Sequence, residues 1–251
     1  MESLKEMEST DLIQKQPLQK PMDLDLMKYS NDNDPKQTLD YWEKRLDNIP
    51  PFNHEKFNVP TRYKDCSLDN FKGNDNLVNQ VKAYKKGQLV LHGKPGTGKT
   101  HLAIALMREL DRRQYLDMCK QAIQAIKVGQ LAYEYGSPGK LFVTVPDLLL
   151  EIRESFKDGG VHSEGQILDK YSEVPLLVLD DLGAEKVTDF ALTTLYILID
   201  RRYREDKDTV ITTNLNLGQI ATHLNARIAS RLSGMGRVVI ESMPDYRKGQ
   251  R

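Results

Sequence analysis

One octapeptide constrains this chain more than any other feature. Residues 93–100 read Gly-Lys-Pro-Gly-Thr-Gly-Lys-Thr and fit the phosphate-loop pattern G-x-x-x-x-G-K-[ST], with an apolar run before them and a helical pattern after them. In such a loop the backbone N–H groups turn inward around phosphate oxygens, and the N-terminus of the next helix adds positive potential. We expect Lys99 to reach the β- and γ-phosphates and the Thr100 hydroxyl to ligate Mg²⁺. The other expected nucleotide contacts are Gly93, Pro95, Gly96, Thr97, Gly98 and His101.

The rest of the chain alternates short apolar runs with longer amphipathic stretches, which is typical of a parallel α/β sheet. The predicted strands are Leu89–His92, Leu141–Val145, Leu176–Asp180, Thr209–Thr213 and Val238–Glu241. Helices are expected after the first four strands. The chain between Lys99 and Leu141 is longer than one crossover helix requires, so we predict that residues 112–136 add a helical insertion.

Two further strands end in polar side chains that can complete a nucleotide site. The run Leu176–Leu179 is followed by Asp180 and Asp181, and the strand at Thr209 is followed by Asn214. We expect Asp180 to hold the hydrated Mg²⁺ and Asp181 to orient or deprotonate the attacking water. Asn214 would contact that water or the γ-phosphate. No guanine-reading Asn-Lys-x-Asp motif follows, which favours ATP.

Arg227 and Arg231 lie four residues apart and therefore share one helix face. Both could reach a neighbouring subunit, where an inserted arginine neutralises charge in the transition state of phosphoryl transfer. A solvated basic helix face explains the same spacing.

Composition limits the partners and the compartment. Lys plus Arg equals Asp plus Glu at 36 each, so a global positive field for nucleic acid is excluded and any DNA contact must be local. Cys66 and Cys119 form no C-x-x-C pair, and we expect free thiols in a reducing compartment. The polar start and the absence of a long apolar run predict a cytoplasmic protein without a membrane partner.

Residues 1–60 are predicted to form an arm that precedes a nucleotide-binding domain at 61–251. The first 36 residues are polar, and Leu39, Trp42 and Leu46 then follow at helical spacing before Ile49-Pro50-Pro51. This short helix either packs on the main domain or offers Tyr41 and Trp42 to a partner.

Taken together, these motifs resemble the DnaC and IstB branch of the AAA+ ATPases over roughly residues 60–247. The resemblance rests on Gly93–Ala103, Phe142–Leu149, Leu179–Glu185, Thr212–Leu215 and Arg227–Leu232. It implies a P-loop core with a five-stranded parallel sheet and without a C-terminal helical lid. It also implies Arg231 as an arginine finger, Arg227 as its companion and Arg247 as a sensor 2 residue.

The loader members of this branch imply an ATP-bound homo-oligomer, a spiral or filament, that grips single-stranded DNA and opens a DnaB-type replicative helicase. The DNA-contacting segment would be Pro146–Asp169, in which Arg153, Phe156 and Lys157 combine cations with an aromatic ring. An ordinary amphipathic helix explains these residues equally. The helicase-binding element would be the arm around Tyr41 and Trp42.

Three alternatives remain open. The nearest is an IstB-like helper of transposition, which shares the ATPase core but acts with a transposase on duplex DNA. A small-molecule P-loop kinase would use Arg227 and Arg231 within one subunit, and a pure interaction module would bind ATP without hydrolysing it. The paired carboxylates and Asn214 favour a hydrolysing AAA+ site over both.

Overall fold

The computed structural model describes residues 35–72, 75–130, 132, 139–156, 163–240, 243 and 245. Most of the polar start (residues 1–34) therefore lies outside the described residues, as do two predicted site residues, Lys157 and Arg247.

Five strands form one parallel sheet in the order β2-β3-β4-β1-β5. Their bounds are β1 Gln88–Gly93, β2 Lys140–Thr144, β3 Leu176–Leu182, β4 Asp208–Thr213 and β5 Gly236–Ile240. The predicted five-stranded parallel sheet is confirmed. The second strand ends one residue earlier than predicted, because the Thr144 hydroxyl accepts the Asp147 N–H and caps the next helix.

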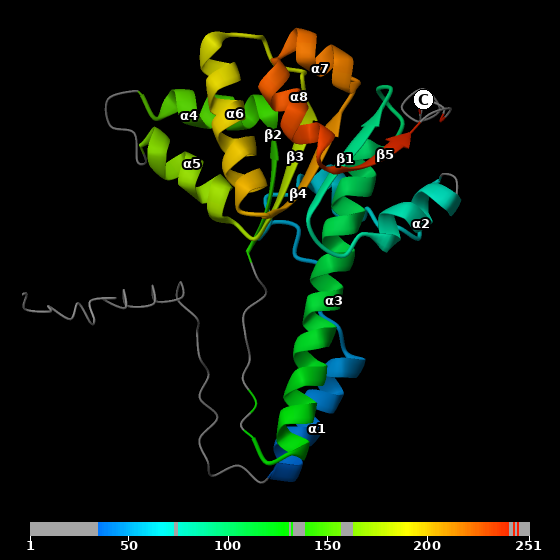
Figure 1. Cartoon of the computed structure of the whole chain (residues 1–251). Helices are drawn as coiled ribbons and strands as arrows, with labels where there is room; N and C mark the ends of the chain where they lie inside the picture. Colours follow the sequence, from blue (N-terminus) through cyan, green and yellow to red (C-terminus); the bar gives the residue numbers. More distant parts are fainter. Residues whose placement is uncertain are drawn as a thin grey trace, which may run out of the picture.

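Helices cover both faces of the sheet (Figure 1). The helices are α1 Pro35–Asp47, a 3₁₀ turn at Thr61–Tyr63, α2 Asp75–Ala83, α3 Lys99–Lys127, α4 Val145–Glu154, α5 Glu164–Glu173, α6 Asp189–Arg204, α7 Leu217–His223 and α8 Ala226–Ser233. Helices α4 to α8 pack on one face, whereas α2 and α3 pack on the other. Among the described residues no helix follows β5.

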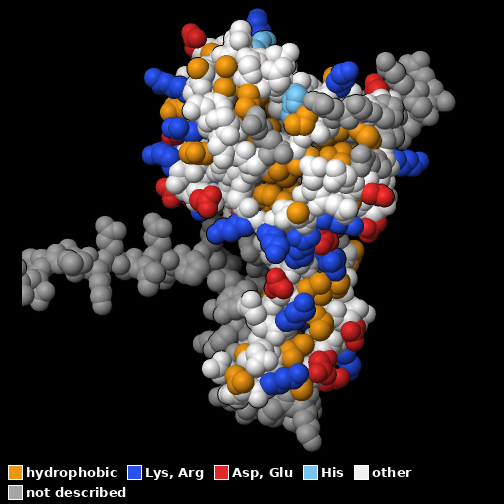
Figure 2. Space-filling model, turned by 45° about the vertical axis from the view of Figure 1, so that its right-hand side comes forward, with side chains coloured by type: hydrophobic (Ala, Val, Ile, Leu, Met, Phe, Trp, Pro, Cys, Tyr) orange, Lys and Arg blue, Asp and Glu red, His pale blue; other side chains and the backbone are white. Residues whose placement is uncertain are grey.

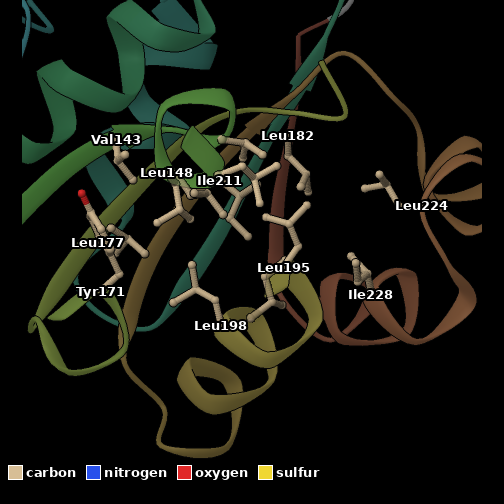
Figure 3. Packing of buried hydrophobic residues seen from close by; sticks show 14 of the residues in the cluster. Val143, Leu148, Tyr171, Leu177, Leu182, Leu195, Leu198, Ile211, Leu224 and Ile228 are labelled. Atoms are coloured by element: carbon tan, nitrogen blue, oxygen red, sulfur yellow. The ribbon is translucent and has the colours of Figure 1, made fainter. Parts of the chain in front are cut away.

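Alternation along the strands divides the core into two layers. In β3, Leu177 and Leu179 point towards α4 to α8, while Leu176 and Val178 point towards α2 and α3. Figure 3 shows the first of these layers, in which side chains from the sheet meet those of α4, α5, α6 and α8. A strand buried on both faces must be apolar throughout, which explains the uninterrupted run Leu176–Leu179.

The predicted helical insertion at 112–136 is present as a continuation of α3 as far as Lys127, and residues 131 and 133–136 lie outside the described residues. Helix α3 continues unbroken for 29 residues to Lys127, because neither Gly nor Pro interrupts the chain between Lys99 and Val128. Its C-terminal half extends beyond the sheet, and α1 lies against it (Figure 1). We call this pair of helices the α1–α3 arm.

The single tryptophan holds the α1–α3 arm together. Trp42 is completely buried and packs with Cys119 and Ala122 of α3. The Arg45 guanidinium lies over the indole, 5.5 Å from the ring centroid. The helix was predicted either to pack on the protein or to offer Trp42 to a partner. The buried indole shows that Trp42 packs.

Both cysteines are buried free thiols, as expected. Among the residues that the structure describes, no helix is both long enough and apolar enough to cross a membrane.

Candidate functional site

The phosphate loop adopts a backbone that only glycine accommodates at two positions. Gly96 and Gly98 have φ values of 79° and 87°, in the left-handed region. There is also no room for a side chain at either position. A Cβ on Gly96 would meet the carboxylate of Asp245, and one on Gly98 would come within 2.6 Å of the Phe71 ring. The loop is thus closely covered by other parts of the chain.

Lys99 lies at the start of α3 and is buried, with 5% of its surface exposed. Its Nζ donates to the carbonyls of Gly93 (2.9 Å) and Lys94 (2.8 Å) and to Oδ1 of Asn214 (2.7 Å). The Thr97 hydroxyl also donates to the Lys94 carbonyl, at 2.8 Å. These contacts join the phosphate loop to the end of β4, so Lys99 and Asn214 lie in one site as the sequence predicted.

Asp180 and Thr100 meet directly. The Thr100 hydroxyl lies 3.0 Å from each carboxylate oxygen of Asp180, and the Thr212 hydroxyl donates to Oδ1 at 2.6 Å. Burial raises the pKa of Asp180 to about 6, and the neighbouring Asp181 charge adds to this, whereas the bonds from Thr212 and Thr100 and the Lys99 charge oppose it. A hydroxyl and a carboxylate side by side are hard oxygen donors of the kind that Mg²⁺ prefers.

Asp181 points differently from Asp180. It is half-buried, has a φ of 58°, and lines the cavity in front of the phosphate loop. Its backbone N–H donates to the Thr212 hydroxyl at 2.9 Å. Asp181 therefore belongs to the lining of this cavity, whereas Asp180 does not.

The cavity has a volume of 760 Å³, which suits a nucleotide. It is lined by Pro95, Gly96, Gly98, Lys99, Thr100, His101, Asp181 and Asn214 from the predicted motifs, and by Arg62, Tyr63, Cys66, Asn70, Phe71, Lys72, Ala184 and Asp245. A larger hollow of 1080 Å³ lies between residues 49–57 and α3 but contains none of the motif residues. We assign the nucleotide to the smaller cavity because the phosphate-binding chemistry is there.

The segment 61–72 is the part of the site that sequence reasoning missed. It packs over the start of α3, where His101 Nε2 lies 2.9 Å from the Ser67 carbonyl and the ring meets Phe71 edge-on at 5.3 Å. Burial lowers the pKa of His101. The segment contains no recognisable motif, and only its place before the first strand could have suggested a role.

The two predicted interface arginines do not belong to the lining of this cavity. Nε of Arg231 donates to Oδ1 of Asp200 in α6 at 2.7 Å. Arg227 is exposed and lies over the Tyr196 ring, 5.7 Å from its centroid. Both are on the side of α8 that faces α6, away from their own phosphate loop.

The predicted DNA-contacting residues gather at the end of α4. Phe156 is 58% exposed and meets Phe190 edge-on at 5.9 Å, and the Arg153 guanidinium lies 5.8 Å from the same ring. Phe190, at the start of α6, is an additional member of this group.

A comparison with protein families decides the identity. The family described as "IstB-like ATP binding protein" matches residues 79–233, which include the phosphate loop, both carboxylates, Asn214 and α8. The chain belongs to this family. The predicted DnaC/IstB-like AAA+ ATPase is thereby confirmed.

Individual members of this ATPase group are similar over most of the chain. The replicative helicase loader DnaC of Escherichia coli K12 is 26% identical over 196 residues, which cover 74% of this chain and 70% of that protein. The uncharacterized protein YdaV of the same strain is 29% identical over 184 residues, 69% of this chain and 64% of YdaV.

Solved structures of the group have the same fold. A crystal structure of the DnaC helicase loader is matched with a TM-score of 0.53 and 25% identity, over 72% of this chain and 100% of that one. DnaI is matched with a TM-score of 0.53 and 26% identity, over 73% and 95% of the two chains. AMPPCP-bound DnaA from Aquifex aeolicus has a TM-score of 0.52 at 21% identity, which is a likeness of fold alone.

Proposed function

We propose that this chain is an ATP-dependent loader of a DnaB-type replicative helicase onto single-stranded DNA during the initiation of DNA replication. One observation carries the proposal. Lys99, Thr100, Asp181 and Asn214 line a single cavity in a chain that resembles named helicase loaders over most of its length. Such a site supports ATP binding and hydrolysis, which a loader uses to change its grip on DNA and helicase.

Within this proposal, Thr100 and Asp180 hold Mg²⁺, and the contact between their oxygens supports the assignment. A bound Mg²⁺ would supply positive charge that stabilises the negative charge of the phosphates. Lys99 binds the phosphates, Asp181 orients the attacking water, and Asn214 fixes the position of that water or of the γ-phosphate. The same cavity is also lined by Arg62, Tyr63, Phe71 and Lys72.

Hydrolysis is proposed to occur at the interface between subunits of a homo-oligomer. Arg231 enters the site of the neighbouring subunit as a finger, and Arg227 accompanies it. The support is that neither side chain lines its own cavity and that both lie on the side of α8 that faces α6, where Arg227 is exposed and Arg231 is partly exposed. Arg231 donates there to Asp200.

Mixed oligomers test this arrangement. Arg231→Ala and Lys99→Ala subunits should each lack turnover, but a mixture forms some interfaces with an intact loop and an intact finger. Partial ATPase activity should then return, measured with single-stranded DNA present. No recovery at any ratio, with parental turnover independent of protein concentration, would mean a site completed within one subunit, as in a small-molecule kinase.

Single-stranded DNA is proposed to bind along α4. Phe156 offers an exposed ring for base stacking, and Arg153 supplies a cation for the phosphate backbone. Phe190 contacts both of these side chains. Lys157 is proposed to extend the same contact.

The helicase is proposed to dock on the α1–α3 arm. Trp42 is unavailable because it is buried, but Glu43 and Asp47 form a short exposed acidic row on α1, beside the exposed ion pair of Asp40 with Lys44 (2.7 Å). Figure 2 shows hydrophobic side chains along the projecting part, and the partly buried residues that pack around Trp42 there include Tyr115 and Met118. An acidic row beside apolar side chains suits a basic, amphipathic partner surface.

A second candidate function is an IstB-like ATP-binding helper of transposition, which the matched family also fits. Pull-down with purified DnaB-type helicase and with an IS21-type transposase, in ATP, in ADP and without nucleotide, separates the two. The loader proposal predicts ATP-sensitive capture of the helicase. Capture of the transposase alone would establish the alternative. Glu43→Lys with Asp47→Lys should abolish helicase capture, whereas Glu205→Lys, exposed after α6, should not.

A further inference from the structure

A single buried hydroxyl in β4 connects the carboxylate of Asp180 to the backbone of Asp181. Thr212 is completely buried, and its Oγ1 donates to Oδ1 of Asp180 at 2.6 Å. The same oxygen accepts the backbone N–H of Asp181 at 2.9 Å. A hydroxyl has one proton and two lone pairs, so it can make both bonds at once.

This hydroxyl lies where the β3–β4 pairing becomes irregular. Leu179 pairs with Ile211, but the next pair is Leu182 with Thr213, so β3 contains one more residue than β4 over this stretch. Asp181 takes the positive φ that such a bulge requires. Because the bulge breaks the ladder, the Asp181 N–H obtains its acceptor from the side chain of β4 instead.

We propose that Thr212 is the positioning residue of this site: one hydroxyl fixes the carboxylate of Asp180 and the bulge that directs Asp181 into the cavity. The inference rests on the proposed roles of Asp180 and Asp181. Thr100 also donates to Asp180. Of these two hydroxyls, only that of Thr212 also accepts the backbone N–H of Asp181.

The hydrogen bonds of Thr212 differ from those of the other threonines near it in β4. Thr213 donates to the carbonyl of Leu182 at 2.8 Å, and Thr209 donates to the carbonyl of Lys207 at 2.8 Å. Neither reaches a carboxylate of the site. Thr209 also accepts from Nε of Arg202 and is 2% exposed, so it is a buried threonine of the same strand with a purely structural environment.

Thr212→Val tests the inference because it keeps the shape and removes the hydroxyl. The expected turnover of ATP falls about tenfold to a hundredfold, the range for one lost hydrogen bond to a charged group. Binding of a fluorescent ATP analogue in EDTA should stay within about threefold of the parent, whereas the tightening of that binding by Mg²⁺ should be lost. Thr212→Ser keeps the hydroxyl and should restore both properties.

Thr209→Val is the matched control: it can lower the melting temperature but should leave the Mg²⁺-dependent tightening unchanged. If Thr212→Val does not fold, Thr212→Ala gives the same comparison. Parental turnover and parental Mg²⁺ response in the variant would overturn the inference, as would equal losses in the Val and Ser variants or a parallel loss of binding in EDTA. A parent that neither binds nor hydrolyses ATP would instead overturn the proposed function, and this inference with it.

Discussion

Replacing Asp180 by asparagine should stabilise the protein at neutral pH, although it removes the carboxylate proposed to hold Mg²⁺. Asp180 is 3% exposed, and its ionised form has lost most of its hydration. The bonds from Thr100 and Thr212 compensate for only part of that loss, since the pKa remains raised. Asparagine has nearly the same shape, carries no charge, and keeps an oxygen that can accept from Thr212.

The expected size follows from the pKa. Burial, with the Asp181 charge, raises the pKa of Asp180 from 3.8 to about 6, and each pH unit of difference corresponds to about 1.4 kcal/mol, hence about 3 kcal/mol in all. Because the folded pKa is the higher one, the folded state binds more protons. The stabilising effect of the protonated carboxyl is therefore complete below 3.8 and is lost as the pH rises through about 6.

Urea unfolding in EDTA without nucleotide, between pH 4 and pH 8, measures this effect. The advantage of Asp180→Asn over the parent should be near zero at about pH 4 and grow towards about 3 kcal/mol at about pH 8. Asp117→Asn is the control, since Asp117 is exposed on α3 and its charge is already hydrated. An advantage that does not change with pH, or a variant less stable than the parent at pH 8, would refute the reasoning.

Three further substitutions test other parts of the account. Lys99→Ala should abolish tight ATP binding. It should also lower the free energy of unfolding by about 1–3 kcal/mol, because three acceptors lose a buried donor. Parental turnover of ATP in this variant would contradict the phosphate-loop role. Asp181→Asn should retain Mg²⁺-dependent ATP binding but lose turnover, and equal losses in titration and steady-state assays would mean that the two aspartates are misassigned. Trp42→Ala should cost the α1–α3 arm about 3–5 kcal/mol of packing, seen as faster proteolysis of α1 with unchanged ATP binding; protection equal to the parent would disprove its role.

The parts of the fold that repeat along the chain could be predicted from the sequence. Strands buried on both faces have to be apolar, and the polar residues after them have to meet at the carboxyl edge of a parallel sheet. The sequence therefore predicts that Asp180, Asp181 and Asn214 lie near the phosphate loop. The parallel sheet itself is confirmed.

The parts that depend on tertiary contacts could not be predicted. The α1–α3 arm could not be predicted, because the contact of Trp42 with Cys119 and Ala122 joins residues that are far apart in the sequence. The segment 61–72 covers the phosphate loop through Phe71 and a carbonyl contact with His101, neither of which has a sequence pattern. The role of Thr212 follows from a bulge, and a bulge depends on the register between two distant strands.

The central claim concerns helicase loading, and a closed DNA circle tests it most directly. A ring-shaped DnaB-type helicase cannot thread onto circular single-stranded DNA unless the ring is opened. With this protein and ATP, gel filtration should recover the helicase together with the circle, and Lys99→Ala should abolish that recovery. Recovery that is the same with and without this protein, or none with it while a transposase is recruited to duplex DNA in ATP, would contradict the account.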